Sequence, residues 1–181
     1  MAERRLLALL RALTEDRVDF ILVGGLAAVL DGTPISTFDV GLVHSREPAN
    51  IGRLLGALSK LEAFFRIQPE RRVRPEESHL AGPGHLNLST LYGPLDLLGT
   101  IGHGRGYEAL LPHSVEMEVG DGVRIRVLDL ETVIAVKEEV GGEKDLATLA
   151  ILKRTLREKQ DRGRDECRAI RVDWRGSGDL T

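Results

Sequence analysis

Apolar residues recur along this chain with two different periods, which together predict helices alternating with strands. Leucines at helical spacing from Leu6 to Leu13 predict a first helix over about residues 3–15. Residues 19–23 form a short, nearly continuous apolar run, which suits a strand that is buried on both faces. Gly24-Gly25 interrupts this run, and residues 26–30 then predict a short helix that ends at Asp31-Gly32.

The remaining pattern predicts a small mixed β-sheet flanked by helices, in an α/β or α+β domain. The turn Gly120-Asp121-Gly122 between two alternating apolar runs predicts a β-hairpin. Residues 68–84 are polar and contain prolines, and they predict a loop that either covers a site or serves as an exposed connector. Further strands are expected over 37–43, 63–67, 86–90, 94–98, 115–119 and 123–128. Further helices are expected over 50–62, with Asn50 as the cap, over a short segment that ends at residue 111, and over 129–140 and 145–158.

Length and charge suggest one folded domain followed by a short tail. The 181 residues suit a single core, which we expect over residues 1–158. The net charge of −3 hides a basic stretch at 153–175, which has nine Lys/Arg against five Asp/Glu. A basic segment can attract nucleic acid, but alternating charges also suit a solvated helix end that leads into a flexible tail over 159–181.

Composition also limits the cellular setting. The longest nearly apolar run covers residues 20–30, which is too short to cross a bilayer. The chain has a single cysteine, Cys167, so an internal disulfide is excluded. A cytoplasmic protein without membrane association is therefore expected.

The residues with candidate chemistry lie in the first third of the chain and at one later position. A glycine pair at a strand-to-helix turn, here Gly24-Gly25, lets backbone N–H groups face an anion. Asp39 is expected on the neighbouring strand, where a carboxylate could hold the metal ion that accompanies a phosphate. Asp96 lies between Leu95 and Leu97, and an acid in such an apolar strand needs a partner.

Residues 22–41 resemble the corresponding segment of the nucleotidyltransferase superfamily, which has the polymerase-β-like fold. Within it, the similarity is to the branch of small bacterial proteins that includes the AbiEii-type toxins of abortive-infection systems. The loop of that family reads Gly-Ser-x-Arg-x-Thr-x-Asp-x-Asp, and here it reads Gly-Thr-Pro-Ile-Ser-Thr-Phe-Asp-Val-Gly over residues 32–41. The resemblance extends over residues 18–158. It includes a strand and a lysine-bearing helix at 127–137, and an element at 142–145 that resembles Gly-Arg-x-Lys-Asp.

The resemblance implies an enzyme that binds a nucleoside triphosphate (NTP) with Mg²⁺ or Mn²⁺ and transfers a nucleotide to tRNA, another RNA or a protein hydroxyl. A cognate antitoxin is a further implied partner. Lys137 could instead be a helix-end lysine whose aliphatic stem covers apolar surface. The residues implied to bind the nucleotide are Gly24, Gly25, Thr33, Thr37 and Lys137, and those implied to be catalytic and to hold the metal are Asp39 and Asp96.

Two positions depart from the family pattern. Ile35 replaces the loop arginine, and Gly41 replaces the second aspartate, so a phosphate-facing cation and a metal ligand are both lost. Two interpretations follow. The chain is either an enzyme with a reduced metal site or a catalytically inactive module of the same fold that binds an antitoxin or RNA.

Overall fold

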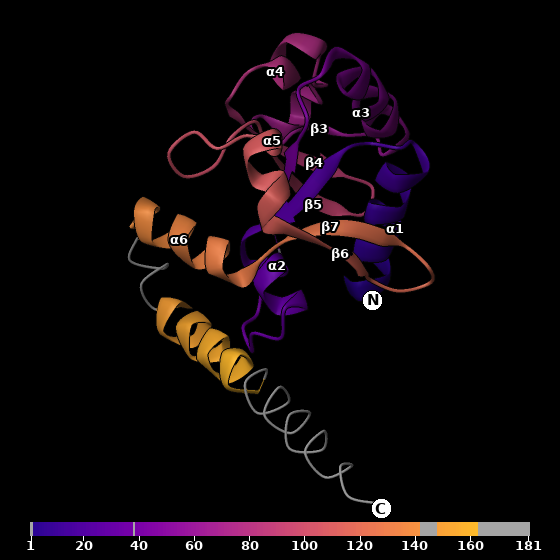
Figure 1. Cartoon of the computed structure of the whole chain (residues 1–181). Helices are drawn as coiled ribbons and strands as arrows, with labels where there is room; N and C mark the ends of the chain where they lie inside the picture. The colour runs from indigo at the N-terminus through magenta and orange to yellow at the C-terminus, as the bar shows by residue number, and fades with distance from the viewer. Residues whose placement is uncertain (1, 38, 142–147, 163–181) are drawn as a thin grey trace, which may run out of the picture.

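The computed structural model describes residues 2–37, 39–141 and 148–162 (Figure 1). The element predicted at 142–145 and the tail from residue 163 onward lie outside the described residues. The α-helices are α1 (Ala2–Glu15), α2 (Gly24–Leu30), α3 (Pro48–Lys60), α4 (Glu77–Ala81), α5 (Tyr107–Leu110) and α6 (Leu130–Val140), followed by a helix over 148–162; 3₁₀ turns cover Pro69–Arg71 and Leu111–His113. The strands are β1 (Phe20–Val23), β2 (Val40–His44), β3 (Phe64–Phe65), β4 (His85–Thr90), β5 (Gly93–Leu98), β6 (Ser114–Glu118) and β7 (Arg124–Leu128).

These strands form one mixed sheet, which confirms the predicted fold class. Its strand order is β3-β4-β5-β2-β1-β7-β6. Near the centre, β1 pairs antiparallel with β2 and parallel with β7, and β2 pairs parallel with β5. The hairpin predicted around Gly120-Asp121-Gly122 is present as the antiparallel pair β6–β7.

Strand β1 lies inside the sheet, between β2 and β7, and its position explains the apolar run at residues 20–23. All residues of β1 are buried, because the sheet is covered on both faces. Helices α1 and α3 pack against each other, and the α1 residues Leu9, Leu10 and Leu13 are almost completely buried. None of the described helices combines the length and the apolar character needed to span a membrane.

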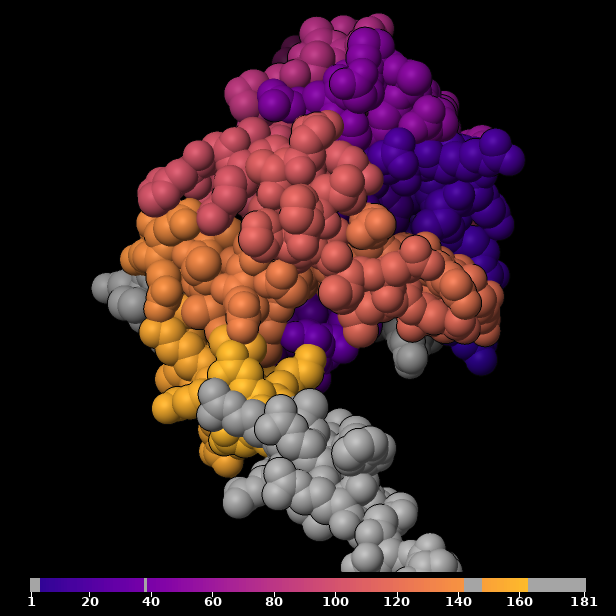
Figure 2. Space-filling model, viewed as in Figure 1, coloured from indigo at the N-terminus to yellow at the C-terminus, as the bar shows by residue number. Residues whose placement is uncertain are grey.

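The helix over 148–162 lies along α6 (Figure 2). Lys153 forms an ion pair with Glu138 of α6, and the side chain of Gln160 donates a hydrogen bond to Glu131. Lys159 also pairs with Asp31 after α2. The described part of this helix reaches residue 162, beyond the predicted end at 158, and these contacts hold it against α6 and the end of α2.

Two boundaries near the predicted site differ from expectation. Strand β2 begins at Val40 rather than at residue 37, so Asp39 precedes the strand. The pairing partners explain this start: β1 ends at Val23 opposite Gly41, and the pairing of β2 with β5 begins at Val40 opposite Leu95, directly after Pro94, which has no N–H to donate. Helix α2 begins at Gly24 rather than at residue 26, so the glycine pair is its first turn.

Asn50 does not cap α3 as predicted, because Glu47 holds the cap position and the helix begins at Pro48. The side chain of Asn50 is instead buried and joins two segments. It accepts a hydrogen bond from the N–H of Asp19 (2.7 Å) and donates to the carbonyls of Asp19 (3.0 Å) and Ser45 (2.8 Å). A buried amide must satisfy its polar atoms, and here it does so by holding the start of β1 against the end of β2.

The loop predicted over residues 68–84 contains more structure than expected. It includes a 3₁₀ turn and α4, whose first turn has a capping box between Glu76 and His79. The His79 ring lies edge-on to Phe65 of β3, with ring centroids 5.1 Å apart. These contacts anchor the segment beside the sheet edge formed by β3.

His44 should make the stability of the fold depend on pH. Its Nε2 lies 2.9 Å from the carbonyl of Leu80, and burial lowers the pKa of His44 below its usual 6.5. The unfolded chain therefore takes up a proton at a higher pH than the folded chain does. The contribution of His44 to the free energy of unfolding should be fully present above pH 6.5. Below pH 6.5 the free energy of unfolding should decrease, by at most about 1.4 kcal/mol per pH unit.

The measurement is urea unfolding at pH 5 and pH 7.5, with His44→Gln as the control, because glutamine keeps an N–H donor for Leu80 without titrating. The variant should show the weaker dependence on pH. Equal pH dependence in the two proteins would contradict the assignment to His44.

Candidate functional site

A cavity of about 440 Å³ lies where β1 passes into α2, beside β2, β5 and α6. Its volume is within the range of small-ligand sites. Both predicted carboxylates line it, and so does every predicted nucleotide-binding residue except Thr33. The lining residues are Val23, Gly24, Gly25, Ile35, Ser36, Thr37, Asp39, Gly41, Asp96, Leu98, Lys137 and Thr148.

Strand register places Asp96 beside Gly41, and both line the cavity. Gly41 lies opposite Val23 of β1 and opposite Asp96 of β5. Asp39 lies directly before β2, two residues from Gly41. Asp39 and Asp96, far apart in sequence, both line the same cavity.

The close approach of the Thr37 side chain favours glycine at position 25. A Cβ atom on Gly25 would lie 2.9 Å from the Thr37 hydroxyl oxygen, too close for an ordinary contact. Gly24 precedes it with a φ of +73°, a conformation that side chains disfavour. The glycine pair thus lets the Thr37 side chain lie directly over the first turn of α2.

Thr33 is not brought to the cavity. Its backbone N–H donates to the carbonyl of Ala28 (2.9 Å), and its side chain is buried beyond the C-terminal end of α2. The cavity lies at the opposite end of this helix, which is about 10 Å long at the standard rise per residue. The structure therefore gives no support to a contact between Thr33 and a ligand in the cavity.

Helix α6 brings Lys137 to the cavity, and both ends of this helix match the sequence prediction. The Asp129 side chain accepts a hydrogen bond from the N–H of Thr132 (2.7 Å), and Gly141 ends the helix with a φ of +65°. Lys137 also lines a smaller, mainly apolar cavity of about 200 Å³ between α6 and the sheet. Its position suits both interpretations of this residue, a cation facing a ligand and a stem covering apolar surface.

The prediction that Asp96 needs a polar partner is confirmed, and the partner is Arg66. Nη2 of Arg66 donates to Oδ1 of Asp96 at 2.5 Å, and the amide of Asn87 donates to the same oxygen at 3.0 Å. The backbone N–H of Arg66 also donates to the carbonyl of Asn87 (2.8 Å). Sequence reasoning missed both residues. The available signal was Asn87 between two leucines, the same pattern as Asp96, but only strand register reveals that they pair.

The two carboxylates differ in their surroundings. Asp39 is exposed and has no hydrogen-bond partner among the described residues, whereas Asp96 is half-buried and shares one oxygen between two donors. The residues of the described ranges contain no group of three or more His, Cys, Asp or Glu suited to a metal ion. This donor set fits one Mg²⁺ or Mn²⁺ beside Asp39 that takes its other ligands from phosphate and water, and it does not fit a pair of ions.

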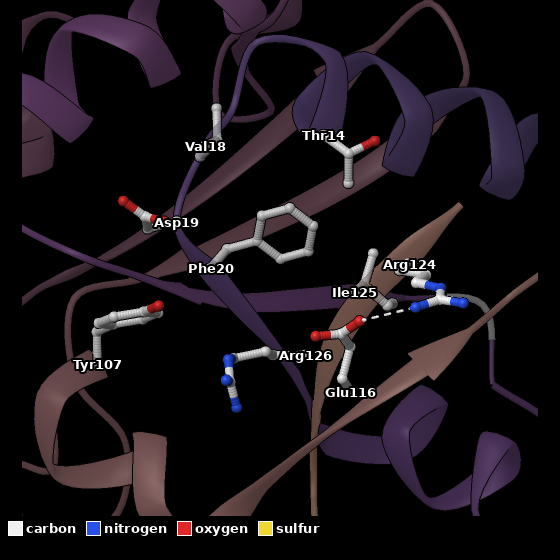
Figure 3. A pocket seen from close by; sticks show the side chains of 9 residues that line it. All are labelled: Thr14, Val18, Asp19, Phe20, Tyr107, Glu116, Arg124, Ile125 and Arg126. Carbon is white, nitrogen blue, oxygen red and sulfur yellow. Dashed lines mark ion pairs between the residues drawn. The ribbon is translucent and has the colours of Figure 1, made fainter. Parts of the chain in front are cut away.

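A second cavity, of about 250 Å³, lies between α1, the start of β1, α5 and the β6–β7 hairpin (Figure 3). Its acids are already paired: Glu116 with Arg124 at 3.6 Å, and Asp19 with Arg53 at 2.7 Å. Burial, aided by the nearby Asp19 carboxylate, raises the pKa of Tyr107 above its usual value. This cavity has no glycine turn and no carboxylate without an ion pair, so the cavity beside α2 is the stronger candidate.

No protein-family model matches the sequence, and no curated protein sequence matches it. Two solved structures are similar in fold. A candidate nucleotidyltransferase from Thermotoga maritima superposes with a TM-score of 0.52 at 18% identity, over 86% of this chain and 92% of the other. The antibiotic-resistance factor ANT(2'')-Ia superposes with a TM-score of 0.55 at 17% identity, over 96% of this chain and 95% of the other. At this level of identity the AbiEii-type branch stays a prediction, and the architecture is settled: the chain has the nucleotidyltransferase fold.

Proposed function

We propose that the protein binds a nucleoside triphosphate in the cavity beside α2 and transfers its nucleotidyl group to a hydroxyl of an RNA, such as tRNA, or of a protein. One observation carries the proposal. A single cavity collects the glycine turn, Thr37, both carboxylates and Lys137 from distant parts of the chain. The nucleotidyltransferase fold supports the same function.

Each group has a role that its chemistry suits. The turn at Gly24-Gly25 and the Thr37 hydroxyl offer hydrogen-bond donors to phosphate oxygens, and Lys137 offers a positive charge to the triphosphate. Asp39 is proposed to hold the divalent cation, which when bound would neutralise charge on the phosphates. Asp96 on the neighbouring strand lines the same cavity, but its carboxylate is already paired with Arg66.

Transfer requires that the acceptor hydroxyl lie in line with the bond that breaks. The hydroxyl oxygen forms a bond to the α-phosphorus, and the bridging oxygen leaves with pyrophosphate and the electron pair of the broken bond. The proton of the acceptor passes to water. The protein contributes position and charge rather than a covalent intermediate, as is usual for phosphoryl groups.

The test is transfer of label from α-labelled NTPs to a bacterial tRNA pool, or to the protein itself, with Mg²⁺ or Mn²⁺. Asp39→Ala should reduce labelling at least about 100-fold, the usual scale for a group that stabilises charge in the reaction. Asp161→Ala, which removes an exposed acid of the helix over 148–162, should leave labelling unchanged. Labelling that survives Asp39→Ala would overturn the assignment of this residue.

The second candidate is a non-catalytic module of the same fold that binds an antitoxin or RNA. Gly41 and the arginine on Asp96 favour it, because both reduce the capacity for metal ions. Nucleotide binding without transfer to any acceptor would support this candidate. If the protein co-purifies with the product of a neighbouring gene, and this partner is absent after that gene is deleted, the partner is the antitoxin.

A further inference from the structure

We infer that the Arg66 guanidinium is a built-in cation of this site, which takes at Asp96 the place of a second divalent ion and contacts the phosphates of the bound nucleotide. The inference rests on the proposed nucleotide site and adds to it a residue outside the family motif. It also predicts that nucleotide binding depends little on divalent metal.

The position of Arg66 is set by a row of residues across neighbouring strands. Arg66 follows β3 and bonds through its backbone to Asn87 of β4. Asn87 lies opposite Asp96 of β5, and Asp96 lies opposite Gly41 of β2. The row therefore runs from a guanidinium through an amide and a carboxylate to a glycine, and its last two members line the cavity.

The charges in this row balance without a metal ion. Two carboxylates, at positions 41 and 96, would leave a negative charge that a divalent cation could neutralise. With Gly41 the only acid in the row is Asp96, and the arginine already neutralises it. A divalent ion that approached Asp96 would meet a guanidinium in hydrogen-bond contact with the carboxylate, and like charges at such distances repel.

Arg66 also retains donors for an anion. A guanidinium carries five N–H donors. Within the described ranges, only Nη2 makes a hydrogen bond, and Nε is buried, so the donors that an anion can reach are those of Nη1. Arginine is well suited to contact phosphate because its planar fork matches two oxygens at once.

The first experiment measures binding of a fluorescent ATP analogue to the full chain, in EDTA and in Mg²⁺. The wild-type protein should bind with dissociation constants that differ less than about threefold between the two conditions. Arg66→Met should weaken binding in EDTA at least about tenfold, and Arg66→Lys should recover part of it. Arg74→Met removes an exposed arginine of the same segment and should change nothing.

Two results of this experiment would overturn the inference. One is wild-type binding that requires Mg²⁺, and the other is unchanged binding by Arg66→Met in EDTA. Thermal unfolding of each variant identifies any loss that comes from misfolding rather than from the missing cation.

A second readout needs no nucleotide. Binding of Mn²⁺, followed by electron paramagnetic resonance, is compared between Gly41→Asp and the double variant Gly41→Asp/Arg66→Met. The double variant should bind Mn²⁺ at least about tenfold more tightly, because a competing cation has been removed. Equal affinities would overturn the inference. If no protein binds nucleotide, the proposed function fails, and this comparison still decides whether Arg66 occupies a cation position.

Discussion

Replacing Gly99 by alanine is expected to destabilise the fold by about 3 kcal/mol or more, the scale of a forced backbone displacement in a packed region. A Cβ atom at this position would lie 2.3 Å from the carbonyl oxygen of Gly82, and 2.7 and 2.8 Å from the Cα and carbonyl carbon of Pro83. All three contacts are with backbone, which cannot rotate away as a side chain could.

Gly99 occupies this position because it joins two segments at the end of β5. It is buried, and its N–H donates to the carbonyl of Gly84 at 2.9 Å. The backbone of residues 82–84 therefore lies directly over Gly99, at the C-terminal end of β5 and three residues after Asp96. Displacement of this segment would also disturb the cavity wall, so nucleotide binding should fall with stability.

Urea unfolding provides the measurement, and Gly56→Ala is the matched control. Gly56 lies in the middle of α3 on its solvent-exposed face, where an added Cβ would meet nothing within 4 Å. The same chemical change should there stabilise the protein by about 0.5–1 kcal/mol, because alanine favours helix. If the Gly99→Ala variant is as stable as the wild type, the backbone of Gly82 and Pro83 does not lie as close to residue 99 as described.

Replacing Gly41 by aspartate is expected to raise the affinity of the protein for Mn²⁺ at least about tenfold, by adding a carboxylate ligand where one acid is paired already. The cavity has room for it. A Cβ on Gly41 would lie 3.5 Å from a methyl of Val23 and 3.9 Å from one of Leu98, which are ordinary contacts. Strand register would place the new carboxylate beside Asp96, in the cavity that Asp39 also lines.

Gly41→Asn is the control, since it has the same shape without the negative charge and should not gain Mn²⁺ affinity. If the wild type shows no transfer and Gly41→Asp shows metal-dependent transfer, the missing carboxylate was the defect. Equal transfer by the wild type and Gly41→Asp, with no gain in Mn²⁺ affinity, would contradict the role given to position 41.

The features predicted well from sequence are those that depend on neighbouring residues. The buried run of β1, the hairpin at Gly120-Asp121-Gly122 and the cap at Asp129 each follow from a local rule, and the structure contains all three. The Asp39 and Lys137 positions came from the family resemblance, and the fold brings both to one cavity.

The features that were missed depend on contacts between distant segments. Asn50 has the residue type of a helix cap, but its partners at Asp19 and Ser45 are supplied by the tertiary fold. The pairing of Arg66 with Asp96 requires the register of β4 on β5, which a periodic pattern does not specify. Thr33 was assigned by its place in a motif; it is not among the residues that line the cavity, and its role in binding stays a prediction.

The parallel pairing of β1 with β7 also affects how the protein is made. Ile21 and Leu22 of β1 pair with Arg126 and Val127 of β7, which are synthesised about a hundred residues later. Until then the nascent chain exposes an apolar strand with one edge unpaired, and such edges recruit other chains. Synthesis that stops before β7 should therefore yield a fragment that needs a chaperone or aggregates, rather than a smaller working domain.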